Sequence, residues 1–118
     1  MKKIIFYSYL KCSTCRNAEK WLKRNDFEFQ LIDIVKEPPL VNYLNLALEQ
    51  YSDDKKRIFN SRGKAFKSLN FDIYVLSKEE IIKLLLSDGK LIKRPFLIYE
   101  GKKVLLGFNE FEYAKQFM

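Results

Sequence analysis

Hydrophobic and polar residues follow different periods in three successive parts of the chain. The first part opens with the continuous apolar run Ile4-Ile5-Phe6-Tyr7, which predicts a strand buried on both faces. Apolar residues then recur at helical spacing to about Asn25, and Ser13-Thr14 supplies cap chemistry at the start of this helix. Three residues are expected to form its buried stripe: Ala18, Trp21 and Leu22.

A second strand is predicted next, because apolar Phe27, Phe29 and Leu31 alternate with polar residues. This strand is expected to end near Asp33. A strand, a helix and another strand in this order favour a right-handed βαβ unit.

The middle of the chain, about residues 38–90, contains helical patterns only. Pro38-Pro39 precedes an amphipathic helix, and shorter helices are expected near Ile58-Phe59 and Phe66–Leu69. Ser77 and Glu80 match a capping box at the start of a further helix. The residues that this last helix is expected to bury are Ile81, Ile82, Leu85 and Leu86. We interpret this segment as a helical insertion on a sheet.

The last part predicts a hairpin followed by a helix. Its strands are Phe96–Tyr99 and Val104–Leu106, joined by a turn at Glu100-Gly101-Lys102. Asn109 is expected to cap a final helix, whose apolar face contains Phe111, Ala114 and Phe117. With no linker or repeat in between, residues 1–118 are expected to form one α/β domain with a mixed four-stranded sheet, βαβ then ββα.

Composition and charge narrow the functional classes. The formal net charge is +7, which fits an anionic substrate or an acidic partner as well as an ordinary solvated surface. Lys and Arg are scattered and no nucleic-acid motif is present, so direct DNA binding is not expected. No signal peptide or membrane span is predicted, and we expect the protein in the cytoplasm.

The two cysteines, Cys12 and Cys15, are the strongest chemical signal. In a reducing compartment a close cysteine pair indicates redox, catalytic or metal-binding chemistry rather than a structural disulfide. The chain has no histidine, which excludes Cys-His nucleophile pairs and histidine-bound metals. Two cysteines are too few for a structural zinc in one chain, so we expect no metal, although a metal shared between two chains remains an alternative.

The position of the pair, after a strand and at the start of a helix, favours redox chemistry. The helix N-terminus together with Lys11 and Arg16 is expected to lower the pKa of Cys12. Cys12 would then be the attacking thiol and Cys15 the buried resolving thiol. Ser13 and Thr14 would shape the turn and hydrogen bond to the sulfur. The alternative is a pair of inert buried cysteines.

Arg94-Pro95 is the second candidate feature, directly before a predicted strand. A cis peptide bond at Pro95 would bring Arg94 toward the Cys12 loop, whereas a trans proline would simply begin the strand.

Several motifs in this order resemble the arsenate reductase (ArsC)/Spx/MgsR family of thioredoxin-like proteins. They are Phe6-Tyr7, Cys12-Ser13-Thr14-Cys15-Arg16, Glu37-Pro38-Pro39, Phe59-Asn60-Ser61-Arg62-Gly63, Leu91-Ile92-Lys93-Arg94-Pro95 and Gly107-Phe108-Asn109. The resemblance implies a glutaredoxin-type thioredoxin fold, a cis Pro95 and a redox-active Cys12. It also implies that Arg62 and Arg94 support the dithiol or bind an anion.

The resemblance implies two alternative functions. In family reductases, arginines hold the oxyanion, and two of these would fall on Asn60 and on Gly107 or Phe108 here. We therefore expect a thiol–disulfide redox protein that reduces arsenate poorly. The alternative is a redox-sensing transcriptional regulator of the Spx/MgsR type, which would bind the C-terminal domain of the RNA polymerase α subunit.

Either function needs partners but no bound cofactor. The expected partners are an oxidised substrate and an external thiol donor of the glutathione, bacillithiol or thioredoxin type. No membrane partner is expected.

Overall fold

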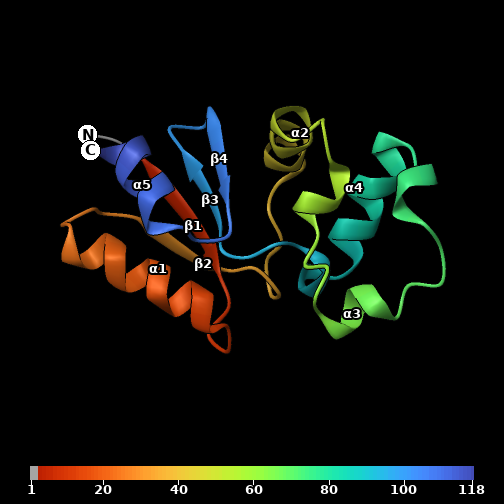
Figure 1. Ribbon diagram of the computed structural model, residues 1–118, viewed down its shortest axis with the longest axis horizontal. Helices are drawn as coiled ribbons and strands as arrows, with labels where there is room; N and C mark the ends of the chain where they lie inside the picture. Colours follow the sequence, from red (N-terminus) through yellow and green to blue (C-terminus); the bar gives the residue numbers. More distant parts are fainter. Residues whose placement is uncertain (1–2) are drawn as a thin grey trace.

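The computed structural model describes residues 3–118, in which a four-stranded sheet lies between two groups of helices (Figure 1). The strands are β1 (Ile4–Ser8), β2 (Gln30–Asp33), β3 (Phe96–Tyr99) and β4 (Lys103–Leu106). The α-helices are α1 (Ser13–Arg24), α2 (Val41–Gln50), α3 (Lys64–Lys67), α4 (Lys78–Ser87) and α5 (Glu110–Phe117). Three 3₁₀ helices complete the order: η1 (Lys55–Ile58), η2 (Ile73–Val75) and η3 (Gly89–Leu91).

The sheet has the strand order β2-β1-β3-β4. β1 pairs in parallel with β2 and antiparallel with β3, and β3 pairs antiparallel with β4. Every residue of β1 is buried, which follows from its continuous apolar run and its place in the middle of the sheet. The predicted mixed four-stranded sheet of an α/β fold is therefore confirmed.

One face of the sheet is covered by α1 and α5 (Figure 1). The core here contains Ile4 and Phe6 of β1, and aromatic rings fill the space between the helices. The ring of Trp21 stacks on Phe27 with centroids 5.8 Å apart and meets Tyr113 edge-on at 5.6 Å. These ring contacts join α1 to the loop that follows it and to α5.

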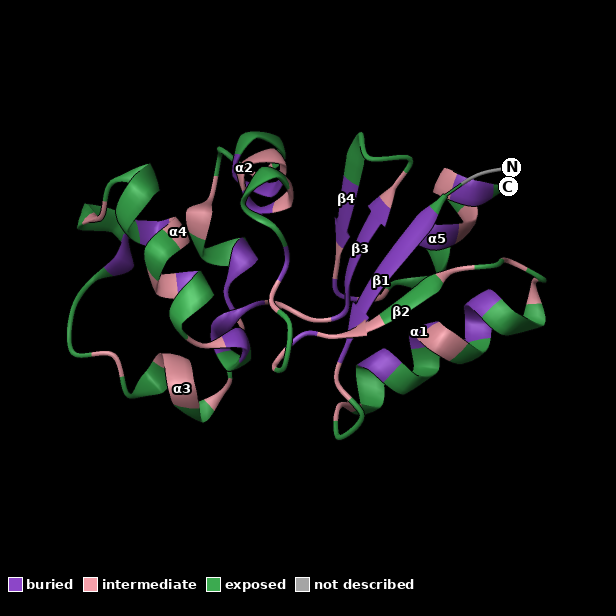
Figure 2. Ribbon diagram, turned by 180° about the vertical axis from the view of Figure 1, so that it is seen from behind, coloured by how far each residue is buried: buried purple, intermediate pink, exposed green. Residues whose placement is uncertain are grey.

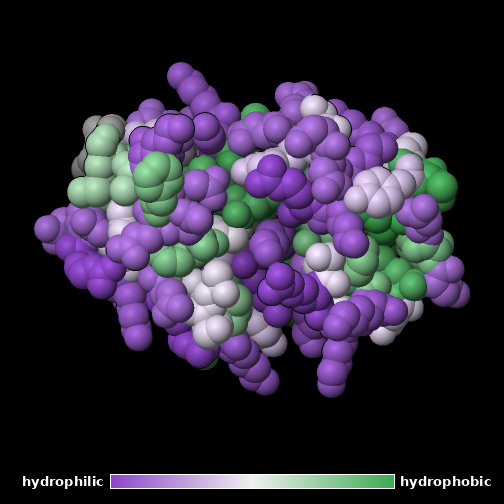
Figure 3. All heavy atoms as spheres, viewed as in Figure 1, coloured by the Kyte–Doolittle hydropathy of each residue, from purple (hydrophilic) through white to green (hydrophobic). Residues whose placement is uncertain are grey.

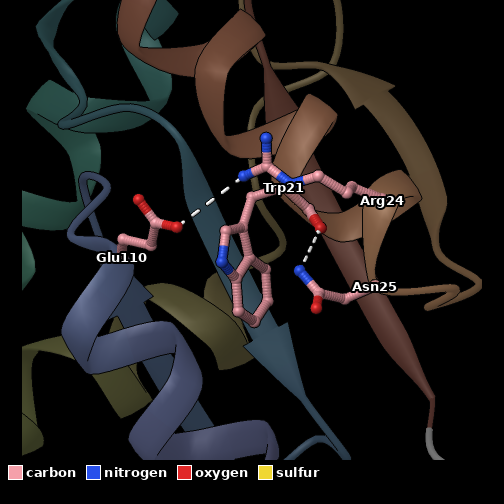
Figure 4. A network of polar contacts seen from close by, with 4 residues as sticks. All are labelled: Trp21, Arg24, Asn25 and Glu110. Atoms are coloured by element: carbon pink, nitrogen blue, oxygen red, sulfur yellow. Dashed lines mark hydrogen bonds and ion pairs between the residues drawn. The ribbon is translucent and has the colours of Figure 1, made fainter.

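Polar contacts at the end of α1 support the same packing. The side chain of Asn25 donates a hydrogen bond of 2.9 Å to the carbonyl oxygen of Trp21, and Arg24 lies 3.7 Å from the carboxylate of Glu110 (Figure 4). Arg24 belongs to α1 and Glu110 opens α5, so this exposed ion pair joins the two helices.

The other face of the sheet packs against the helical lobe, which we define as residues 41–91 and which lies apart from α1 and α5 (Figure 2). Ile5 and Ile98 contact a core that includes Leu44 of α2 and Ile81 of α4. The side chain of Gln50 both donates to and accepts from the backbone of Val104, at 2.9 and 2.6 Å. The lobe is thereby fixed to β4.

Some local predictions are confirmed and others are wrong. Ser77 and Glu80 form the predicted capping box, and Asn109 caps α5. However, Phe111 is 76% exposed and Leu86 is 39% exposed, because α5 and α4 bury a narrower stripe than their apolar residues suggested. The second strand begins at Gln30, so Phe27 and Phe29 precede it and pack against the α1 core instead.

None of the helices within residues 3–118 has the length and apolarity needed to cross a lipid bilayer.

Candidate functional site

Cys12 is itself the N-cap of α1, which corrects the prediction that Ser13-Thr14 caps the helix. Its backbone is extended, and its sulfur accepts a hydrogen bond of 3.4 Å from the backbone N–H of Cys15. The Cys12 N–H donates to the carbonyl oxygen of Tyr9 at 2.9 Å, which closes the loop before the helix. The thiol therefore occupies the position where a helix N-terminus stabilises negative charge.

Cys15 lies in the first turn of α1 and is fully buried, whereas Cys12 is partly exposed. Both are free thiols. Of the pair, the sulfur of Cys12 is the one that a substrate can reach from solvent.

Local donors lower the pKa of the Cys12 thiol. Partial burial opposes ionisation, but hydrogen bonds from the Cys15 side chain and backbone, together with the Arg94 guanidinium, outweigh it and favour the thiolate. The expected direction of the shift is therefore found.

Burial instead raises the pKa of Cys15 to about 12, and the hydrogen bond and charge of Cys12 act in the same direction. The backbone at Tyr9 and the hydroxyl of Ser8 act against this shift without cancelling it. One sulfur of the pair is thus disposed to ionise and the other to keep its proton.

Arg94 reaches the dithiol from the segment before β3. The Arg94–Pro95 peptide bond is cis. The guanidinium lies over the ring of Tyr9, 4.9 Å from its centroid, and donates a hydrogen bond of 3.4 Å to the carbonyl oxygen of Lys90. These contacts hold its charge beside Cys12.

Two other predicted cations, Lys11 and Arg16, are not among the main groups that lower the pKa of Cys12. The Arg16 guanidinium turns back and donates to the carbonyl oxygen of Leu10 at 2.7 Å, and Lys11 is exposed in the loop. Neither is among the groups that shift the thiol, because the nearer donors come from Cys15 and Arg94. The largest contributions to the low pKa of Cys12 thus come from Cys15 and Arg94 rather than from the two cations nearest in sequence.

Ser13 and Thr14 are exposed in the first turn of α1. Within residues 3–118 the Cys12 sulfur accepts its hydrogen bond from the Cys15 N–H, and Arg94 acts on its pKa, whereas neither hydroxyl is among these groups. We call residues 9–16 the dithiol turn, and its own backbone provides its geometry.

Arg62 lies in a different place, a hollow of about 450 Å³ between the sheet and the helical lobe. We call this hollow the basic pocket, after its cations Lys56, Arg57, Arg62 and Lys93. Figure 3, viewed as in Figure 1, shows hydrophilic side chains gathered around the middle of the face turned to the reader. Arg62 and Arg94 thus belong to separate sites, although Lys93 and Arg94 are consecutive.

Sequence reasoning missed three residues near these sites. Ser8 is the one buried polar residue of the described chain. Its position between Tyr7 and Tyr9, in an otherwise apolar run, could have indicated that it is buried. Tyr9 carries Arg94 on its ring, and Lys93 lines the basic pocket. The roles of Tyr9 and Lys93 could not be inferred locally. Tyr9 is 85 residues from Arg94, and Lys93 is 31 residues from Arg62.

The positions of the two missing arginines are occupied differently. Gly107 has a φ of 72°, and a Cβ added to it would lie 3.1 Å from Cε of Lys93. Asn60 lines the basic pocket. In residues 3–118 no three His, Cys, Asp or Glu side chains gather as metal ligands would.

Comparison with known proteins gives a consistent result. The family model described as "ArsC family" matches residues 7–116. YusI of Bacillus subtilis is 40% identical over 114 residues, covering 95% of this chain and 96% of that protein. The global transcriptional regulator Spx of Lactiplantibacillus plantarum is 33% identical, with coverage of 92% and 82%.

A solved structure has the same fold over nearly the whole chain. It is described as a possible arsenate reductase from Streptococcus mutans and superposes with a TM-score of 0.86 at 38% identity. The match covers 95% of this chain and 97% of the other, so the sheet, the helical lobe and the dithiol turn all belong to the shared architecture.

Proposed function

The chain belongs to the ArsC family, and from this premise we propose that it is a thiol–disulfide redox protein. Cys12 attacks and Cys15 resolves. The observation that carries the proposal is the asymmetry of the two thiols: the partly exposed Cys12 has a lowered pKa, and the buried Cys15 has a raised one.

The first step is attack by the Cys12 thiolate on one sulfur of a substrate disulfide. A bond forms between Cys12 and that sulfur, the substrate S–S bond breaks, and the other substrate sulfur leaves as a thiolate. Arg94 and the Cys15 N–H hold the Cys12 thiolate before attack. The thiolate carries the electron pair, so no bound cofactor is required.

The second step releases the substrate. In the mixed disulfide Cys12 has no negative charge, so one of the causes that raise the pKa of Cys15 is removed. Cys15 then attacks the Cys12 sulfur, its proton passes to the departing substrate thiolate, and a Cys12–Cys15 disulfide forms. Two electrons have moved from the dithiol to the substrate.

An external thiol must return the pair to the dithiol form. We propose a donor of the glutathione, bacillithiol or thioredoxin type, in the reducing environment of the cytoplasm.

A stoichiometric reaction with an aromatic disulfide such as dithiobis(nitrobenzoate) tests the two roles. The reduced wild-type protein should release two thiolates per chain and retain no adduct. Cys15→Ser should release one and keep a mixed disulfide at Cys12, which mass spectrometry detects. Cys12→Ser should react slowly, because Cys15 is buried and holds its proton.

A wild-type protein that keeps the adduct as Cys15→Ser does would contradict resolution by Cys15. A Cys12→Ser variant that reacts as fast as wild type would contradict attack by Cys12.

Arsenate is expected to be a poor substrate for this site. Oxyanions are usually bound by charge-assisted, bidentate hydrogen bonds from arginine. Asn60 and Gly107 cannot supply them, and Lys93 supplies a single ammonium beside Gly107. Arsenate turnover by the protein with glutathione and glutaredoxin should stay near the background without protein, whereas disulfide turnover should not.

A second candidate function is supported by the likeness to Spx, which is named a global transcriptional regulator. In this alternative the same dithiol is a redox switch and the partner is the C-terminal domain of the RNA polymerase α subunit. Oxidised and reduced protein should then retain that domain to different extents in a pull-down. Failure of both forms to retain it would eliminate this candidate and leave the reductase proposal intact.

A further inference from the structure

The basic pocket carries four cationic side chains but only one carboxylate among its described lining residues, so its net charge is positive. The ion pairs found within residues 3–118, Lys23 with Glu19 and Arg24 with Glu110, lie elsewhere. Asp54 is the acidic residue of the pocket, and its carboxylate accepts hydrogen bonds from the Lys56 N–H at 3.0 Å and the Tyr74 hydroxyl at 2.9 Å. None of the four cations, Lys56, Arg57, Arg62 and Lys93, forms an ion pair within residues 3–118, and their charges outnumber that of Asp54.

The backbone walls of the pocket are firmly joined. The Asn60 N–H donates to Leu91 and the Lys93 N–H donates to the carbonyl of Ile58, both at 2.8 Å. Between these bonds, Phe59 and Ile92 form an isolated antiparallel bridge, and both side chains are buried. The two segments that carry Arg62 and Lys93 are thus held side by side before any ligand arrives.

Aromatic rings hold two of the cations. The Arg57 guanidinium lies over the ring of Tyr51, 4.5 Å from its centroid, and the Lys56 ammonium lies 5.8 Å from the centroid of Phe66. Such contacts limit the motion of long side chains without neutralising them. The pocket therefore loses less conformational freedom on binding than four free surface cations would.

The size of the pocket indicates more than a simple ion. Its volume of about 450 Å³ is within the range of sites for organic ligands. Leu106 and Phe59 add an apolar part to the lining. A ligand that carries two or more anionic groups on an organic frame matches this combination.

We propose that the basic pocket binds an organic anion with at least two carboxylate or phosphate groups. Arginine pairs with both groups through paired N–H donors, and lysine through a point charge. Cys12 and Cys15 are not part of the lining. Binding in the basic pocket can therefore be tested independently of the thiol chemistry.

Calorimetric titration at low salt with two probes tests the site. S-methylglutathione presents two carboxylates and a blocked thiol, and inorganic pyrophosphate presents phosphate oxygens. At least one probe should bind, and the one that binds identifies the source of the anionic groups. In ¹⁵N–¹H spectra of the wild-type protein, the shifts should be largest at Asn60, Ser61 and Arg62, a readout that needs no variant.

The Arg57→Gln/Lys93→Gln double variant should weaken binding by about tenfold or more. The matched control is Lys102→Gln/Lys115→Gln, which removes the same charge from exposed positions outside the pocket and should change affinity less than about twofold.

Three outcomes would overturn the proposal. The first is that neither probe binds. The second is that the control double variant loses as much affinity as the pocket variant, which would make the attraction a property of net charge. The third is binding of a DNA duplex with neither small anion bound, which would make this face a nucleic-acid contact instead.

Discussion

The dithiol turn and the basic pocket both present positive charge to an anion, but they do so by different means. At the dithiol turn the donors are backbone and short side-chain groups around one partly buried sulfur, with Arg94 held on Tyr9. In the basic pocket the charges are on long side chains around an open hollow. Short-range donors change the pKa of a resident group, whereas exposed charges attract a visiting one.

The largest expected effect concerns the proton on Cys15. In the native state Cys15 keeps its proton up to a pKa of about 12, whereas an unfolded thiol loses it near pH 8.5. Between these values the unfolded state binds fewer protons, so the free energy of unfolding falls as pH rises. Cys12 has the opposite shift, so it adds a slope of opposite sign until the unfolded thiol has lost its proton, and little above about pH 9.5.

The reduced wild-type protein should therefore lose up to about 1.4 kcal/mol per pH unit above pH 9 that Cys15→Ala does not lose. Urea unfolding between pH 8 and 10.5 measures this slope. The smaller side chain of Cys15→Ala lowers stability equally at every pH, so the difference in slope is the diagnostic quantity. Parallel curves for the two proteins would contradict a buried, proton-holding Cys15.

The next effect concerns Arg94. Replacing it by Gln removes one donor and the nearest charge from Cys12, so the pKa of the thiol should rise. Iodoacetamide alkylation at pH 7 should slow by roughly three- to tenfold, and the pH–rate profile should move to higher pH. Arg94→Lys keeps the charge and should stay closer to wild type. An unchanged profile for Arg94→Gln would assign the low pKa to Cys15 alone.

Added salt should affect anion binding in the basic pocket much more than it affects the pKa of Cys12. Raising the salt concentration from roughly 0.05 to 0.5 M should weaken anion binding in the basic pocket by about five- to tenfold. The midpoint of the Cys12 alkylation profile should move by less than about 0.5 pH units, because its hydrogen bonds act at contact. Equal sensitivity in both measurements would remove the distinction between fixed donors and exposed charges.

The smallest effect concerns the helical lobe. Ser77→Ala removes the side-chain acceptor of the exposed α4 capping box and should lower the free energy of unfolding by about 0.5–1 kcal/mol. Ser52→Ala, at an exposed position with no cap role, is the control. The Cys12 alkylation profile should be unchanged in both, since α1 packs on the opposite face of the sheet. A shifted profile in Ser77→Ala would show that the lobe influences the thiol.

Local features of the fold could be predicted from sequence, and features made by distant contacts could not. The capping box at Ser77 and Glu80 and the buried run of β1 each depend on a few neighbouring residues. The wrong expectation of a buried Phe111 shows the limit, since apolar spacing does not give the width of the face that a helix packs.

The candidate site shows the same division. The roles of Cys12 and Cys15 were proposed from their spacing and their place before a helix. The sequence pointed to Lys11 and Arg16 as sources of the low pKa, whereas a main contribution comes from Arg94, which lies 82 residues after Cys12. The basic pocket combines seven residues between Asp54 and Arg62 with Lys93 and Leu106, a combination that no local pattern contains.

The N-cap position of Cys12 has one more consequence. A charged acceptor forms a hydrogen bond roughly twice as strong as a neutral one, so the Cys15 amide is gripped more tightly by a thiolate than by a disulfide sulfur. Oxidation of the pair to a disulfide would therefore weaken the hydrogen bond from the Cys15 N–H to the Cys12 sulfur in the first turn of α1. We therefore expect the first turn of the twelve-residue helix α1 to be less stable in the oxidised protein than in the reduced protein.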